Sequence, residues 1–86
     1  MARALIVERR EVSLPERADY VDRLPGTKAH YKDAGCHFWV FEDHGERGAF
    51  LEFIESSSAE RLTAALASAP ARTAGMPPLY IEVEIS

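Results

Sequence analysis

The sequence predicts one α+β domain over residues 1–86, in which two helices cover one face of a four-stranded antiparallel sheet. Three observations predict this fold class. A chain of 86 residues is the size of one small domain. Four stretches have the apolar composition or the alternation of strands. Two Ser-x-x-Glu patterns, one before the second strand and one before the fourth, each open a stretch with helical spacing of apolar residues.

The first strand is predicted over residues 3–9, because residues 4–7 are an unbroken apolar run. Such a run indicates burial on both faces and hence a central strand. The first helix is predicted to begin at Ser13, since Ser13 and Glu16 fit a capping box. Spacings of three and four residues predict that its buried face carries Val21, Leu24, Lys28 and Tyr31.

Proline interrupts the first helix. The residues Leu24-Pro25-Gly26 predict a kink or break, because proline removes a helical hydrogen bond and disfavours helix at the residue before it. A second helical piece is predicted over residues 27–34, with Gly35 as a left-handed cap. An aromatic-rich β-hairpin is then predicted over residues 36–55, around a polar turn at residues 43–48.

The second helix is predicted to open at the capping box Ser57-Ser58-Ala59-Glu60 and to end at Pro70. Its apolar stripe comprises Ala59, Leu62, Ala65, Leu66 and Ala69. Residues 71–78 are predicted to form a loop, because they include one glycine and two prolines. The last strand is predicted over residues 79–85, with Leu79, Ile81, Val83 and Ile85 on one face.

The predicted order of strand, helix, strand, strand, helix, strand is the ferredoxin-like βαββαβ arrangement. Right-handed crossovers then give the spatial strand order 4-1-3-2. The helices cover one sheet face only, so the other face would expose aromatic side chains to water and needs a cover. The expected cover is the same face of a second copy of the chain, which makes the predicted assembly a homodimer.

Composition excludes several classes of protein. The formal net charge of -4 repels phosphate and argues against nucleic-acid binding. The single cysteine, Cys36, allows no disulfide within the chain and is expected to be a small buried residue. No signal peptide or membrane-length apolar run is recognised, so a soluble cytoplasmic protein is expected, with no membrane partner.

Three segments carry a resemblance to a known superfamily. They are the helix end at Ala34-Gly35-Cys36, the aromatic strand Trp39-Val40-Phe41, and the pattern Phe50-x-Glu52-x-Ile54-Glu55 before an Ala/Leu helix. Together they resemble the dimeric α+β-barrel superfamily, above all its antibiotic-biosynthesis-monooxygenase-like domains. The resemblance implies two ferredoxin-like sheets packed face to face around a barrel. It also implies a ligand cavity, either within the barrel or between each sheet and its helices.

The superfamily includes cofactor-free monooxygenases, haem-degrading enzymes, isomerases and stress proteins, so its fold does not choose a reaction. This chain departs from the pattern at two places. Ile54 stands where these domains often have tryptophan, and the second helix has no histidine of the kind that haem-degrading members use as the iron ligand. No haem or other cofactor is therefore expected.

Glu52 is the first candidate for catalysis, since a carboxylate removed from water in a central strand can serve as a general acid or base. The alternative is that Glu52 lies on a wet interface beside Glu82 and Glu84 and pairs with an arginine such as Arg3 or Arg9. The imidazole of His37 is the second candidate for proton transfer. The expected ligand-binding walls are the aromatic residues Trp39, Phe41, Tyr31 and Phe50. The alternative for the aromatic stripe is a place in the core or in the dimer interface.

The three histidines are not expected to form a metal site. His37 and His44 are seven residues apart on one strand, so they point to opposite faces and lie roughly 23 Å apart when extended. His30 is on a helix. Periodicity puts Trp39 and Phe41 on one strand face and Phe38 and Val40 on the other, but it leaves open which pair lies under the helices.

Residues 47–53 also resemble the third strand of RNA-recognition domains, which share this topology. Two of the stacking aromatic rings that those domains use are missing, and the charge is acidic, so no RNA partner is expected. The sequence therefore predicts a homodimer that binds a small apolar or aromatic molecule, with an activity like that of cofactor-independent monooxygenases or isomerases. The alternative is a non-catalytic metabolite-binding or assembly dimer.

Overall fold

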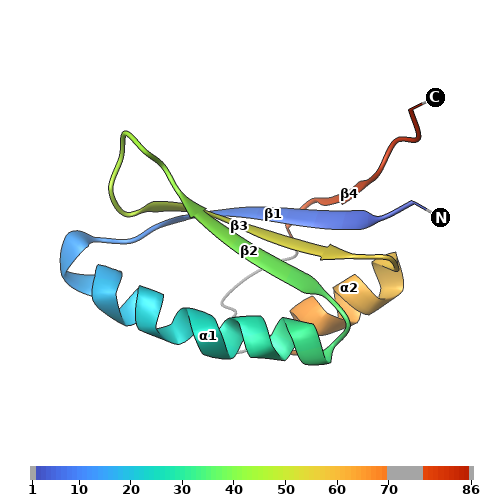
Figure 1. Cartoon of the computed structure of the whole chain (residues 1–86), viewed down its shortest axis with the longest axis horizontal. Coiled ribbons are helices and arrows are strands. Elements are labelled where there is room, and N and C mark those ends of the chain that lie inside the picture. The colour runs from blue at the N-terminus through green and yellow to red at the C-terminus, as the bar shows by residue number, and fades with distance from the viewer. Residues whose placement is uncertain (1, 70–76, 86) are drawn as a thin grey trace.

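Two layers make up the computed structural model, which describes residues 2–69 and 77–85 (Figure 1). The strands β1 (Ala4–Glu11), β2 (His37–Glu42), β3 (Ala49–Ser56) and β4 (Leu79–Ile81) form one antiparallel sheet in the order β2-β3-β1-β4. The helices α1 (Arg17–Asp33) and α2 (Ala59–Ala67) both lie on one side of this sheet. The predicted ferredoxin-like fold is confirmed, because the observed order is 4-1-3-2 read from the other edge.

The strand β1 lies in the centre of the sheet, as its apolar run predicts. It pairs with β3 along its whole length and with β4 on its other edge, so that Ile6 lies between Ile54 and Leu79. Ala4 and Ile6 point toward the helices and are buried. The strand runs two residues further than the predicted end at residue 9, because Arg10 and Glu11 continue the ladder with β3.

The main core lies between the sheet and the two helices. Tyr31 of α1 stacks on Phe38 of β2, with ring centroids 5.3 Å apart. Cys36 is buried beside them, as predicted, and burial raises the pKa of its thiol. From α2, the core receives the predicted stripe residues Leu62, Ala65 and Leu66.

The start of α1 differs from the prediction. A short 3-10 turn, η1 (Leu14–Glu16), precedes the helix. The Ser13 hydroxyl does not cap a backbone amide but donates a hydrogen bond of 2.8 Å to the Glu16 carboxylate. The predicted capping box is therefore wrong, because the two side chains that should satisfy the helix amides satisfy each other.

The helix α1 runs through Pro25 without interruption. The predicted break, with a second helical piece over residues 27–34, is therefore wrong. Its buried side chains are Tyr20 and Tyr31, while Val21 is exposed, which corrects the predicted face. The face shifts because Tyr20 reaches a buried partner on β3, described below. The helix ends as predicted, with Gly35 in the left-handed region at φ 79°.

The helix α2 begins one residue later than the predicted cap. Ser58, rather than Ser57, is the N-cap, and its hydroxyl oxygen accepts the backbone amide of Arg61 at 3.2 Å. The predicted end at Pro70 and most of the predicted loop 71–78 lie outside the described residues.

The hairpin of β2 and β3 is confirmed, and its turn includes a glycine that no other residue replaces easily. Gly48 has φ 94°, and a Cβ atom there would lie 2.3 Å from the Val12 carbonyl oxygen. The Gly48 carbonyl in turn accepts the Val12 amide at 2.8 Å. This close contact joins the turn to the end of β1.

The strand β4 is shorter than predicted. It comprises three residues instead of the predicted range 79–85, and the ladder ends where the Glu82 amide donates to the Arg3 carbonyl at 2.8 Å. Within residues 2–69 and 77–85, no helix combines the length and the apolar character needed to cross a membrane.

Candidate functional site

The sheet face opposite the helices, called the open face here, exposes a set of apolar side chains. Strand register and alternation place Leu5, Val7, Trp39, Phe41, Phe53 and Tyr80 on it. Trp39 is 45% exposed and Phe41 is 60% exposed, whereas Phe38 is buried under the helices. The structure thus decides the question that periodicity left open: Trp39 and Phe41 face away from the helix layer.

A hollow of about 340 Å³ lies at one end of the open face. Its apolar lining comes from three strands, as Leu5 on β1, Trp39 on β2, and Tyr80 and Ile81 on β4. Arg3, Glu55 and Glu82 form its polar lining. A concave apolar lining with few polar groups is typical of sites for small molecules.

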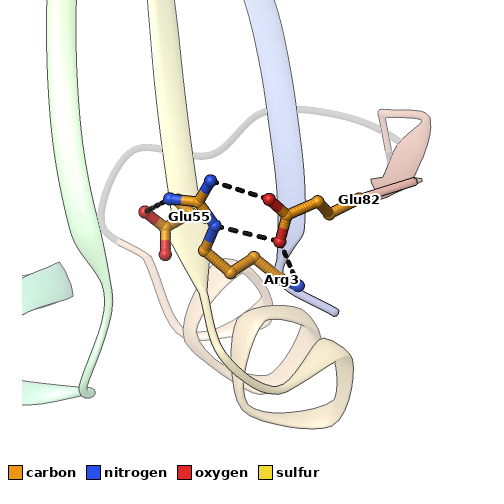
Figure 2. A network of polar contacts seen from close by, with 3 residues as sticks. All are labelled: Arg3, Glu55 and Glu82. Carbon is orange, nitrogen blue, oxygen red and sulfur yellow. Dashed lines mark hydrogen bonds and ion pairs between the residues drawn. The ribbon is translucent and has the colours of Figure 1, made fainter. Parts of the chain in front are cut away.

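The polar lining is a network centred on Arg3 (Figure 2). The guanidinium donates to both oxygens of Glu82, from Nε at 3.1 Å and from Nη2 at 2.9 Å, and lies 3.8 Å from a carboxylate oxygen of Glu55. The Arg3 backbone amide also donates to Glu82 at 3.2 Å. These bonds fix the Glu82 side chain across the end of β1.

The Arg3 contacts also set the charge of the hollow. The side-chain hydrogen bond from Arg3, followed by the one from its backbone amide, lowers the pKa of Glu82 from an ordinary 4.5 to about 2. The same pairing raises the pKa of Arg3. One arginine facing two glutamates leaves a formal charge of -1, so the network is better suited to neutral or cationic ligands than to anions.

Aromatic pairs extend from the hollow along the open face. The ring of His37 stacks on Trp39, with centroids 5.8 Å apart. Further along β2, Phe41 meets Phe53 of β3 edge to face at 5.5 Å. Of the predicted site residues, His37, Trp39 and Phe41 are therefore together on this face.

The other predicted site residues lie on the helix side of the sheet. Glu52 is only 6% exposed, and its Oε2 atom accepts a hydrogen bond from the Tyr20 hydroxyl at 2.6 Å and forms an ion pair with Arg10 Nε at 3.0 Å. Glu52 does not lie beside Glu82 or Glu84, and its arginine partner is Arg10.

The contacts of Glu52 explain why it tolerates burial. Burial, and then the hydrogen bond to Glu52, raise the pKa of Tyr20 above its usual range, so its hydroxyl remains a donor. Burial alone would lower the pKa of Arg10, but the close contact with the Glu52 carboxylate, its negative charge and the charge of Glu8 together raise the pKa overall. A buried carboxylate with a cation and a hydroxyl as partners forms a satisfied polar cluster.

Phe50 and Tyr31 also belong to the helix side. Phe50 is buried against Tyr20, with ring centroids 4.5 Å apart, and the Arg17 guanidinium lies 5.7 Å from its ring centre. Tyr31 is in the main core. The sheet thus separates Glu52, Phe50 and Tyr31 from the residues of the open face, and the six candidates do not form one site.

No group of three potential metal ligands comes together within the described ranges. His30 lies between the helices, where its Nε2 atom makes a hydrogen bond of 2.9 Å with the Ala65 carbonyl oxygen. His37 is on the open face, and His44 is exposed in the hairpin turn.

Several residues of these clusters were missed by the sequence reasoning. Tyr20 and Arg10 hold Glu52, while Tyr80 and Glu82 line the hollow. The alternation visible in the sequence groups Tyr80 and Glu82 on one face of the last strand, but it does not show that the helices cover the other face. No local sequence pattern identifies Tyr20 as a site residue, because its partner Glu52 lies 32 residues away.

Comparison with protein-family models, with curated proteins and with solved structures finds no match.

Proposed function

We propose that this chain acts as a homodimer whose two open faces enclose a binding site for a small apolar or aromatic molecule. The single observation that carries the proposal is the hollow of about 340 Å³ in an exposed aromatic sheet face. A hollow of this volume falls at the small end of ligand pockets, which are about 300–1,000 Å³.

The second copy is supported by the exposed side chains of the open face. Trp39, Phe41 and Tyr80 are all more than one third exposed, on adjacent parts of one surface. Contiguous exposed aromatic surface is typical of interaction sites rather than of free protein surface. A sheet of this size also gains a larger core by pairing, which small domains without disulfides or metals need.

The small-molecule site is supported by the chemistry of the hollow. Trp39 and Tyr80 offer aromatic walls and Leu5 an aliphatic one, and the Arg3 network offers hydrogen-bond acceptors and donors at one end. A planar molecule can stack on the aromatic rings while its polar edge meets the network. This arrangement supports binding more directly than it supports catalysis.

The resemblance to the superfamily also implies an activity like that of cofactor-independent monooxygenases or isomerases. Its two proton-transfer candidates, Glu52 and His37, lie on opposite sides of the sheet. Glu52 could act only on a ligand between the sheet and the helices, and there Tyr20 and Arg10 already bond to its Oε2 atom. We therefore propose binding as the function, in either a metabolite-binding protein or an enzyme.

The proposal is tested by titrating the purified chain with N-phenyl-1-naphthylamine, a neutral aromatic dye whose emission rises in apolar surroundings. Saturable binding with one dye per protomer is expected, with energy transfer from Trp39, the only tryptophan. Tyr80→Ser should weaken binding at least about fivefold, since one wall of the hollow is lost.

Leu14→Ser is the matched control, because Leu14 is also an exposed apolar residue but lies in η1, away from the hollow. Its dye affinity should equal that of the unchanged chain. A dimer that binds no dye saturably, or that binds it equally well after Tyr80→Ser, would leave the assembly dimer as the better account.

A further inference from the structure

The polar lining of the hollow includes a carboxylate that its neighbours do not fully satisfy. Arg3 donates hydrogen bonds of 3.1 and 2.9 Å to Glu82, whereas Glu55 lies 3.8 Å from the guanidinium, beyond hydrogen-bond distance (Figure 2). Within residues 2–69 and 77–85, no group donates a hydrogen bond to the Glu55 carboxylate. The negative charge of the network is therefore concentrated on Glu55, because the charge of Arg3 is directed at Glu82.

Glu55 is also largely removed from water. Its side chain is 15% exposed, whereas that of Glu82 is 41% exposed. His37, the cross-strand partner of Glu55, stacks on Trp39. Removing a carboxylate from water without a hydrogen-bond donor is unfavourable in free energy. A ligand with a positively charged donor would supply both the missing hydrogen bond and the counter-charge.

Aromatic and aliphatic side chains surround this carboxylate on the open face. Register places Leu5 of β1 beside Glu55, and Tyr80 of β4 beside Leu5. Trp39 lines the same hollow from β2. Trp39 is 45% exposed and Tyr80 is 53% exposed, so both rings are accessible to a ligand. A cation near the face of such a ring is attracted by the negative charge of the π-system.

The spacing of the strands sets the length of the ligand. Glu55 is on β3 and Tyr80 is on β4, with β1 between them. Neighbouring strands lie about 4.8 Å apart, so the two residues start roughly 10 Å apart on the sheet. This span fits an aromatic ring joined to an ammonium group by a short chain. A small inorganic cation would contact Glu55 but leave the aromatic walls uncovered.

We infer that the hollow binds an arylalkyl ammonium ion, with its ammonium group on Glu55 and its ring against Trp39 and Tyr80. This ligand class rests on the proposed binding site and deepens it. A ligand carboxylate would be repelled by the charge of Glu55, and a neutral hydrocarbon ring would leave Glu55 without a donor. The charge of the ligand is therefore the property by which this hollow selects it.

The first test is competition for N-phenyl-1-naphthylamine on the purified, unchanged chain at neutral pH. Three competitors of similar size differ in charge: phenethylamine is a cation, 2-phenylethanol is neutral and phenylacetate is an anion. Phenethylamine should displace the dye at a concentration at least about tenfold lower than 2-phenylethanol, which corresponds to about 1.4 kcal/mol. Phenylacetate should be the weakest competitor of the three.

The second test removes the charge of the carboxylate but keeps its shape. In Glu55→Gln, the preference for phenethylamine over 2-phenylethanol should fall below about twofold, while the affinity for 2-phenylethanol stays the same. Glu11→Gln is the matched control, because it removes the same charge from the same face of β1. Glu11 is 71% exposed and pairs with Ala49, at the end of β1 away from the hollow. This variant should keep the full preference.

The possible outcomes distinguish the ligand class from the binding site. Equal displacement by phenethylamine and 2-phenylethanol in the unchanged chain would overturn the ligand class and leave the binding site intact. A preference that survives Glu55→Gln would overturn the role of Glu55. If Glu55→Gln weakens the dimer and the unchanged chain shows no preference, Glu55 belongs to the interface and the ligand class is wrong. A chain that binds no dye saturably would overturn both proposals.

Discussion

Glu52 shows how one buried side chain can direct the packing of a helix. Its carboxylate accepts a hydrogen bond from Tyr20 of α1 and forms an ion pair with Arg10 of β1, so three elements meet at one oxygen atom. A buried carboxylate without such partners would be strongly unfavourable. The need to satisfy Glu52 therefore explains why Tyr20, rather than the more apolar Val21, points inward from α1.

Loss of the Tyr20 hydroxyl tests this role. Tyr20→Phe keeps the ring against Phe50 but removes the hydrogen bond of 2.6 Å to Glu52. The free energy of unfolding should fall by about 1.5–3 kcal/mol, the range for hydrogen bonds to charged groups. Urea denaturation measures it, with Tyr80→Phe as the control at an exposed tyrosine, where the change should stay within about 0.5 kcal/mol. Equal effects of the two substitutions would refute the role of the buried bond.

The lowered pKa of Glu42 predicts that the stability of the folded chain depends on pH. Hydrogen bonds from the Arg17 side chain and then from the Gly48 amide lower its pKa in the folded chain from an ordinary 4.5 to about 2. A depressed folded pKa contributes stability that is present above pH 4.5 and is lost as the pH falls toward 2. Glu42→Gln should therefore lower the thermal midpoint at pH 7 and make its decline between pH 4.5 and 2 shallower.

Thermal unfolding followed by circular dichroism at several pH values measures this effect. Asp22→Asn, on the exposed surface of α1, is the control and should leave the acid decline as steep as in the unchanged chain. A Glu42→Gln variant with an unaltered acid decline would show that the Arg17 pair contributes nothing to stability.

At the scale of elements, two glycines should respond in opposite ways to the same substitution. Gly48 has a positive φ, and an added Cβ would meet the Val12 carbonyl oxygen, so Gly48→Ala should destabilise the chain by about 2 kcal/mol or more. Gly26 lies inside α1 with no atom within 4 Å of an added Cβ, so Gly26→Ala should stabilise it by about 1 kcal/mol. Urea denaturation measures both. Changes of the same sign would contradict the account of the hairpin turn.

The elements that sequence patterns predicted well are those whose signals are local. The unbroken apolar run of β1 and the helical spacing of the α2 stripe can each be read within one segment, and Gly35 has its own backbone preference. The continuous passage of α1 through Pro25 could not be predicted, because the helix is held on both sides of the proline by Tyr20 and Tyr31, whose partners lie on distant strands.

The candidate site was predictable only in part, for a physical reason. Alternation correctly grouped Trp39 with Phe41, but it cannot tell which side of a sheet the helices will cover. Glu52 was singled out because it lies between apolar residues, and it is indeed buried. Its partners Tyr20 and Arg10 come from elements distant in sequence, so no local pattern could identify them.

At the scale of the whole molecule, we propose that a second copy covers the open face. Among the described residues, the sheet packs its core against the two helices, while its opposite face leaves Trp39 45% and Phe41 60% exposed. The exposed residues Val83 and Ile85 belong to the segment 82–85, which leaves the sheet on the side away from the helices (Figure 1). One symmetric association would cover all of these surfaces together.

The most direct measurement is a dilution series in which native mass and Trp39 emission are recorded on the same samples. Light scattering should give twice the 9.6 kDa chain mass at high concentration. As dilution lowers the mass, the emission of Trp39 should move to longer wavelength, because dissociation exposes the open face to water. A mass that stays at 9.6 kDa, or a dimer whose dissociation leaves Trp39 emission unchanged, would contradict the account.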